Sequence, residues 1–135
     1  MTISYDEVRV ALETQFKDNW TDTPISWENA PIDIEEDEFV RFTIVWFGAS
    51  NQTFGTTDTR KTGQIGVQIF VPRDVGSGAA TRYADGVAAI LENKQFGQIL
   101  TYAASLTVVG EGMRRIKDVE YGYFQLNVAI PIDAQ

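Results

Sequence analysis

Apolar residues recur at helical spacing near the start of the sequence. The stripe consists of Tyr5, Val8, Leu12 and Phe16. Ser4 and Glu7 have the spacing of a capping box, in which each side chain satisfies a free backbone N–H of the first helical turn. The pattern predicts a helix that ends near Asp18, because the residues from 19 to 24 are typical of turns.

Several segments in the first half of the chain have the patterns of strands. A short strand is expected at 25–27. The segment 39–47 is rich in aromatic and β-branched residues and, apart from Arg41 and Thr43, is apolar on both faces, which predicts a central strand covered on both sides. Apolar residues at every second position predict a further strand that stops at Pro72. These residues are Ile65, Val67, Ile69 and Val71.

Between these strands, residues 48–63 form a polar connection of sixteen residues. Connections of this length in compact domains are usually functional or disordered. We interpret this one as an extended hairpin arm.

The second half of the chain begins with another helical pattern. Ser77, between two glycines, is expected to cap a helix that ends near Asn93. Its apolar stripe consists of Tyr83, Val87, Ile90 and Leu91, together with Ala80, Ala84 and Ala88. Strands are expected at 103–109 and 121–131. In the last strand, Phe124, Leu126, Val128 and Ile130 should share one face.

The expected order of elements is α-β-β-β-α-β-β. Hairpin-connected strands with helices between them indicate an α+β fold, with two helices packed on a mixed or mainly antiparallel sheet. A length of 135 residues favours a single domain over 1–135, and such a chain buries a sizeable core without a disulfide or metal.

Composition excludes several kinds of chemistry. The sequence has neither cysteine nor histidine, so it has no disulfide, thiolate nucleophile, Ser-His-Asp triad or HExxH zinc site. Nineteen acidic against eleven basic residues give a net charge of -8, which argues against general binding to duplex DNA. The first residues lack the pattern of a signal peptide, and no apolar run has the length of a membrane span. We expect a soluble protein that is made in the cytoplasm, has no membrane partner and is not an enzyme.

The most prominent polar feature is an acidic run without a basic residue. It contains Asp33, Glu35, Glu36, Asp37 and Glu38. A calcium loop of the EF-hand type that starts at Asp33 would need glycine at its sixth position and glutamate at its twelfth, where Glu38 and Ile44 stand. We therefore expect no metal, and we interpret the run as a solvated loop or an electrostatic contact surface. Nothing in the sequence implies a cofactor.

Basic residues concentrate elsewhere, in two predicted loops. They are Arg60, Lys61, Arg114, Arg115 and Lys117. Acidic and basic loops at separate places allow the acidic loop of one subunit to meet the basic loop of a neighbour. Such head-to-tail contacts close into rings or extend into filaments. Ordinary solvated loops are the alternative, and charge alone does not separate the two.

Five stretches of the sequence resemble, in matching order, the tail terminator-like proteins of long-tailed bacteriophages. They are Trp27-Glu-Asn-Ala-Pro31; Phe39-Val-Arg-Phe-Thr43 with Phe47-Gly48; Arg60-Lys-Thr-Gly63 with Val67-Gln-Ile-Phe-Val-Pro72; Gly76-Ser-Gly-Ala-Ala80; and Phe124-Gln-Leu-Asn-Val-Ala-Ile-Pro131. Together they span nearly the whole chain.

The resemblance implies a structural protein of the virion, at the head-proximal end of the tail. Proteins of this kind form a ring, usually of six copies, that caps the tail tube at its final length and offers a docking surface for the filled head. The implied partners are further copies of the chain, the tail tube protein and a head-completion protein, with DNA passing through the ring without specific binding. The acidic run and the five basic residues are then the expected contacts with a neighbouring subunit or the tube.

Two other functions remain open from the sequence. One is another neck component, such as a head-tail connector or stopper, which would bind on the portal side. The other is a module that binds a small molecule or a carbohydrate. Ring formation and binding to tail tubes would distinguish the terminator from both.

Overall fold

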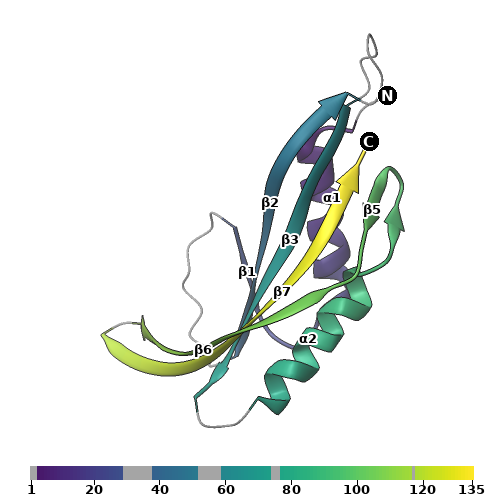
Figure 1. Cartoon of the computed structure of the whole chain (residues 1–135). Coiled ribbons are helices and arrows are strands. Elements are labelled where there is room, and N and C mark those ends of the chain that lie inside the picture. Colours follow the sequence, from purple (N-terminus) through teal and green to yellow (C-terminus); the bar gives the residue numbers. More distant parts are fainter. Residues whose placement is uncertain (1–2, 29–37, 52–58, 74–76, 117) are drawn as a thin grey trace.

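In a computed structural model of the chain, two helices lie against one face of a seven-stranded sheet (Figure 1). The structure describes residues 3–28, 38–51, 59–73, 77–116 and 118–135. The helices are α1 (Tyr5–Asn19) and α2 (Gly78–Leu91). The strands are β1 (Ile25–Trp27), β2 (Phe39–Asn51), β3 (Thr59–Pro72), β4 (Gln95–Phe96), β5 (Ile99–Thr101), β6 (Ser105–Ile116) and β7 (Val119–Ala134).

The strands follow the order β1-β2-β3-β7-β5-β4, and β6 also pairs with β7. Only β1, which pairs in parallel with β2, departs from the antiparallel arrangement of the described strands. The predicted α+β class, with two helices on a mixed and mainly antiparallel sheet, is confirmed.

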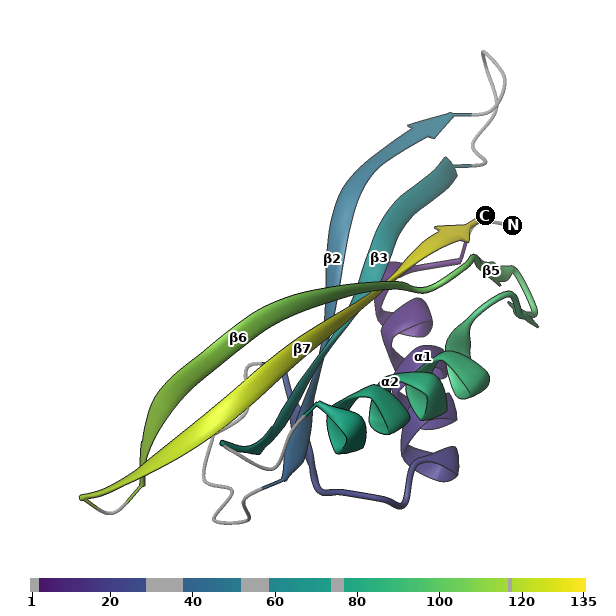
Figure 2. The same ribbon diagram turned by 60° about the horizontal axis from the view of Figure 1, so that its bottom comes forward.

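Strand β7 has two different neighbours on one of its sides. Its first part, from Val119 to Ala129, pairs with β6, and its last residues, from Ile132 to Ala134, pair with β5. Because β3 pairs only with the stretch from Tyr123 onward, the tip of the β6–β7 hairpin extends past the sheet. Figure 2 shows this hairpin projecting away from the two helices.

The core lies between the helices and the sheet. The alternation that predicted β3 is reproduced in its burial, because every second residue from Lys61 to Val71 is buried and the residues between them are only partly buried. The helices contribute Val8, Leu12, Phe16, Ala80, Ala84, Val87 and Leu91 to the same core. Trp20 is also buried and stacks on Phe16, with ring centroids 5.4 Å apart.

The two helix starts differ. Ser4 and Glu7 form the predicted capping box, with both bonds 3.1 Å long. Ser77 occupies the N-cap of α2, as predicted, but its side chain makes no capping bond. A capping residue normally has extended backbone angles, whereas Ser77 is already helical at φ -85° and ψ -5°.

Strand β2 is not the doubly covered central strand that its composition predicted. Among the described strands, its neighbours are β3 and β1, and β1 pairs only with Val40, Arg41 and Phe42. The helices cover one face. On the other face Phe39 is buried and stacks on Phe70, whereas Val45 is exposed, so that face is covered only near the start of β2.

The described parts of the polar connection at 48–63 pair as the two sides of a hairpin, since β2 continues to Asn51 and β3 begins at Thr59. Residues 52–58 of the predicted arm lie outside the described residues. The pairing shifts between Trp46 and Gly48. Gly63 lies opposite this shift, and a β-carbon there would lie 2.4 Å from the carbonyl oxygen of Val45. The arm thus requires glycine at this position.

Strands β4 and β5 were not predicted, and β6 and β7 are longer than expected. The predicted strand at 103–109 begins at Ser105 and continues to Ile116. The sequence hides this continuation because the pairing shifts between Val108 and Gly110, and Gly110 has a positive φ of 107°. The bulge breaks the two-residue period on which strand prediction depends.

Neither helix in the described part of the chain combines the length and the apolar character needed to cross a membrane.

Candidate interaction surfaces

The predicted acidic surface is represented by one described residue. Asp33, Glu35, Glu36 and Asp37 lie outside the described residues. Glu38 accepts a hydrogen bond from the hydroxyl of Tyr83 and so joins the start of β2 to α2. This bond, together with burial, raises the pKa of Tyr83 to about 12. Within the described part of the chain, Glu38 therefore meets a tyrosine and none of the predicted basic residues.

Arg60 contacts a buried carboxylate of its own chain. Its Nε donates to Asp133 Oδ2 over 2.8 Å, and a second guanidinium nitrogen lies 2.5 Å from the same oxygen. The Asp133 side chain is only 5% exposed, and the Tyr102 hydroxyl lies 3.5 Å from Oδ2. The hydrogen bond from Arg60 to Asp133 raises the pKa of Arg60 above its usual value. This pair fastens the start of β3 to the end of β7.

Lys61 is also engaged within the chain. It is 7% exposed, its Nζ donates to the Ile3 carbonyl over 2.9 Å, and the same nitrogen lies 4.9 Å from the centre of the Tyr5 ring. Lys61 thus ties the start of the chain to the sheet. Little of its side chain is left for a partner.

The second basic cluster lies at the tip of the β6–β7 hairpin. Arg115 is exposed and lies opposite Glu120. The Arg114 backbone pairs with Tyr121, while its side chain and all of Lys117 lie outside what the structure describes. Because the Arg115 side chain is exposed, it is accessible to a partner.

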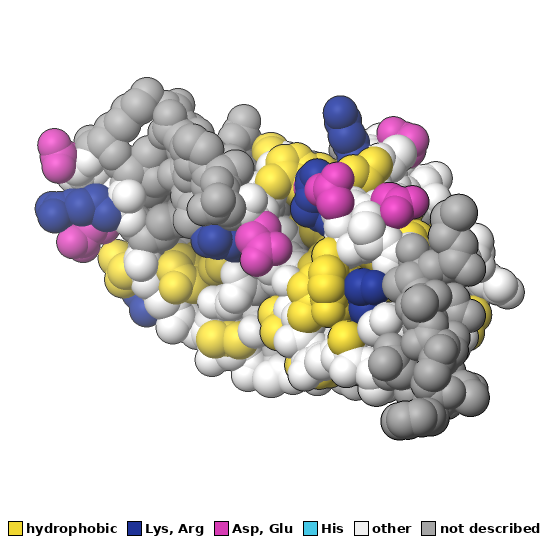
Figure 3. Space-filling view, turned by 90° about the horizontal axis from the view of Figure 1, so that it is seen from above, with side chains coloured by type: hydrophobic (Ala, Val, Ile, Leu, Met, Phe, Trp, Pro, Cys, Tyr) yellow, Lys and Arg dark blue, Asp and Glu magenta, His cyan; other side chains and the backbone are white. Residues whose placement is uncertain are grey.

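The exposed apolar residues on this hairpin carry no functional motif in the sequence. We call them the hairpin patch: Leu106, Val108, Val109, Met113 and Val119. Figure 3 shows hydrophobic side chains at the surface among charged ones. The run of apolar residues from Leu106 to Val109 predicted a strand, but it contained no sign that the strand would lie beyond the helices.

A second apolar surface lies where β2 extends past β1. We call it the β2 patch: Tyr5, Val45, Trp46 and Phe47. Tyr5, Val45 and Phe47 are exposed, and the partly buried Trp46 packs edge-on against Tyr5 at 4.7 Å between ring centroids. A groove of about 400 Å³ runs beside it, lined by Tyr5, Asp6, Arg9, Glu28, Ile44 and Trp46. Exposed apolar patches of this kind mark interaction sites.

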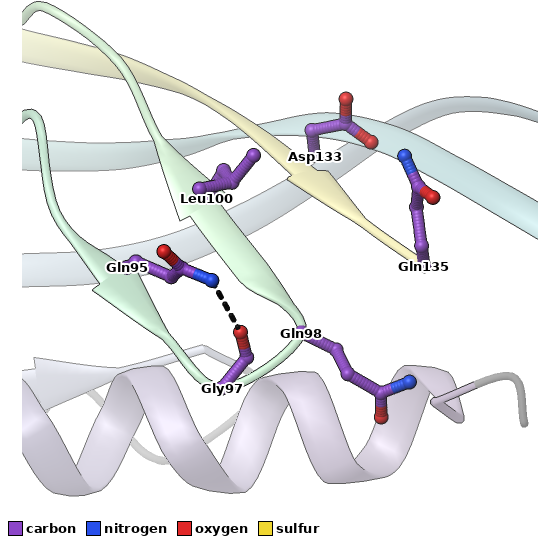
Figure 4. A pocket seen from close by; sticks show the side chains of 6 residues that line it. All are labelled: Gln95, Gly97, Gln98, Leu100, Asp133 and Gln135. Carbon is purple, nitrogen blue, oxygen red and sulfur yellow. Dashed lines mark hydrogen bonds between the residues drawn. The ribbon is translucent and has the colours of Figure 1, made fainter.

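A hollow of about 400 Å³ lies between the β4–β5 hairpin and the end of β7 (Figure 4). Its lining consists of Gln95, Gly97, Gln98, Leu100, Asp133 and Gln135. Gln95 donates to the Gly97 carbonyl over 3.1 Å, and Asp133 is held by Arg60. The hollow therefore offers amides and an engaged carboxylate, without a nucleophile activated by a base. The described residues also contain no group of three or more acidic side chains placed to hold a metal ion.

The described residues thus present exposed surfaces as their most prominent feature. The sequence matches a family model described as phage tail terminator protein over residues 7–111. No curated protein matches the chain. A solved structure that is 18% identical superimposes with a TM-score of 0.65, over 98% of this chain and 96% of that chain. At that identity the likeness establishes the fold alone. The family model covers most of the chain, and this protein therefore belongs to the phage tail terminator family of tail structural proteins.

Proposed function

We propose that the protein forms a ring, of six copies, that caps the tail tube, ends its polymerisation and provides the surface on which the head docks. The observation that carries this proposal is the family match over residues 7–111, which includes most of α1, all of α2, strands β1 to β5 and the first part of β6. The chain would act as a structural part of the virion at the head-proximal end of the tail.

The surfaces of the chain support an assembly role. Two apolar patches lie on different strands, β6 and β2, of the same sheet. Different patches on one subunit suit head-to-tail association, in which each subunit uses one patch toward each neighbour. A ring closes when the rotation between neighbours divides a full turn.

Charged residues would then orient the contacts. In this proposal the exposed hairpin tip, with Arg114, Arg115 and Lys117, faces the acidic run of a neighbour or acidic groups of the tube. Rim charges of this kind set encounter rate and register more than affinity. Arg60 and Lys61 would act on the interface only through the strands they fasten, because both are engaged inside the chain.

The net charge of -8 is compatible with DNA passing through the ring without being bound. DNA carries one phosphate charge per base on each strand, and a protein with an excess of acids repels it at low and moderate salt. An acidic lumen would let DNA pass without specific binding.

Tube assembly with the tail tube protein of the same phage tests the proposal. Added terminator should stop elongation, and electron microscopy should show a ring at one end of each tube. Arg114→Glu combined with Arg115→Glu should weaken capping strongly. Arg82→Glu combined with Lys94→Glu makes the same charge change at exposed positions on and just after α2 and serves as the control.

Two results would contradict the proposal. If the Arg114/Arg115 variant forms rings and caps tubes like the natural sequence, the charged hairpin tip is not a contact. If the natural chain binds purified heads and leaves tubes growing, the protein is a neck component of the connector type instead.

A further inference from the structure

The sheet has an open edge on each of its two sides. On one side, β6 pairs only with β7, so its outer backbone groups have no neighbouring strand in the described part of the chain. On the other side, β1 pairs with β2 only as far as Phe42, and β2 continues to Asn51. One backbone N–H in that stretch, of Ile44, donates to Glu28 Oε2 over 3.3 Å. An open edge is a template for pairing with another chain.

The two edges run in opposite directions. Strand β2 is antiparallel to β3, β3 to β7, and β7 to β6. Strand β6 therefore runs opposite to β2 within one chain. In a head-to-tail ring all subunits keep the same orientation toward the axis, so β6 of one copy would meet β2 of the next in the antiparallel sense. This is the pairing that the rest of the sheet already uses.

Both edges carry apolar side chains on the helix side of the sheet. On the helix side, Leu106 and Val108 continue the row of Val128 and Leu126, which lie opposite them on β7. On the same side of β2 stand the buried Ile44 and the partly buried Trp46. On the other face β2 exposes Val45 and Phe47. Joining the edges would bury apolar side chains against apolar side chains on the helix side.

We propose that β6 of one copy pairs antiparallel with the part of β2 beyond Phe42 in the next copy, so that the sheets join into one continuous sheet around the ring. This inference rests on the ring of the proposed function. It adds which strands pair between neighbouring copies. The alternative of β6 pairing with β6 of a second copy would make a closed dimer and leave the β2 patch uncovered.

The offset between the two edges fits a closed ring of strands. Ser105 lies level with Ala129, Ala129 with Gly66, and Gly66 with Thr43. From that level β6 runs toward one end of the sheet, and the open part of β2 runs toward the other. Joining them shifts each copy along the strand direction by a constant amount. A constant stagger is the condition under which strands close into a barrel.

Introduced cysteines test the pairing directly, because the natural sequence has none. Thr107 is exposed, and it lies opposite Asn127 on the helix-free face of the sheet. A chain with Thr107→Cys and one cysteine on β2, at Thr43, Val45 or Phe47, is oxidised or treated with a short bifunctional maleimide. We expect covalent dimers to hexamers with at least one of the three. Thr107→Cys with Val10→Cys, on the exposed side of α1, is the control and should give no such series.

A second pair of variants weakens the joint without a cross-link. Val108→Lys places a charge on the edge of β6, and Val10→Lys places the same charge on α1. Charged residues on an edge strand oppose its pairing with another strand. The concentration at which half of the chains assemble should rise about tenfold for Val108→Lys and stay unchanged for Val10→Lys.

The outcomes separate this inference from the proposed function. Covalent dimers of the Thr107→Cys chain alone would mean that β6 pairs with β6, and would overturn the proposal. Hexamers by mass that cross-link at none of the three β2 positions would overturn the strand pairing and leave the capping function intact. Cross-linked rings that fail to cap tubes would support the pairing and refute the proposed function.

Discussion

Two pairs of neighbouring residues on β6 and β7 have the same chemistry and opposite surroundings. Leu106 lies opposite Val128, and Val108 lies opposite Leu126, all on the helix side of the sheet. Leu126 and Val128 are 1% and 2% exposed, whereas Leu106 and Val108 are 50% and 65% exposed. Helix α2 packs mainly on β7 and β3. The same apolar pattern therefore makes a core on one strand and a free surface on the next.

This difference shows why a strand that looks like core can serve as an interface. A monomer that leaves leucine and valine largely uncovered on an edge strand gains little stability from them. Their apolar surface yields free energy only when another chain covers it. The row on β7 should therefore stabilise the monomer, and the row on β6 should stabilise the assembly.

Truncating the two leucines should give the largest contrast. Leu126→Ala leaves a cavity in the core and should lower the free energy of unfolding by about 2–5 kcal/mol. Leu106→Ala should lower it by less than about 1 kcal/mol in the monomer, because that side chain is already half exposed. Urea unfolding at low protein concentration measures both. Equal losses would mean that Leu106 belongs to the core.

The buried and the exposed ion pair of the sheet should also differ in how much they stabilise the fold. Arg60→Gln removes the cation that faces the buried Asp133 carboxylate, and it should lower the urea midpoint clearly. Arg73→Gln breaks the exposed pair with Glu111 on β6, 3.1 Å long, and should change the unfolding free energy by less than about 1 kcal/mol. A larger loss of unfolding free energy for Arg73→Gln would mean that the contact between Arg73 and the β6–β7 hairpin is a main source of stability in the monomer.

The bond from Tyr83 to Glu38 should make the stability of the fold decrease at alkaline pH. A tyrosine in the unfolded chain loses its proton near pH 10, whereas Tyr83 in the folded chain keeps it to about pH 12. Its stabilisation is therefore complete below pH 10 and is lost as the pH rises to 12.

The variant Tyr83→Phe tests this pH dependence. It should be less stable than the natural chain by about 1 kcal/mol at pH 8. That difference should shrink between pH 10 and pH 12 in parallel unfolding curves of the two proteins. A constant difference across this range would show that the hydroxyl does not titrate against Glu38.

Much of the fold could be predicted because its signals are local. Helix α1 has both a capping box and an apolar stripe, and β3 keeps a strict two-residue period. Strands β4 and β5, of two and three residues, are too short to show a period, and the bulge before Gly110 hides the length of β6. Strands β5 and β6 form by pairing with β7, and β4 by pairing with β5, and no local pattern reports such contacts.

The contact surfaces were harder to predict, for a different reason. Charge identified Arg60 and Lys61 as contacts, but a basic residue looks the same whether its partner belongs to its own chain or to another. Asp133 and the Ile3 carbonyl, which engage them, lie 73 and 58 positions away in the sequence. In the same way, the apolar run of β6 predicts burial without saying by which chain.

Light scattering behind size exclusion, over a concentration series and at two salt levels, shows whether the chain assembles into a ring of six copies. We expect a species of about 91 kDa, six times the 15.1 kDa of one chain. The same species should persist at high salt if apolar strand edges hold the joints, because salt screens charges and leaves burial intact. A chain that stays monomeric at every concentration and also fails to bind tail tubes would contradict the proposed ring.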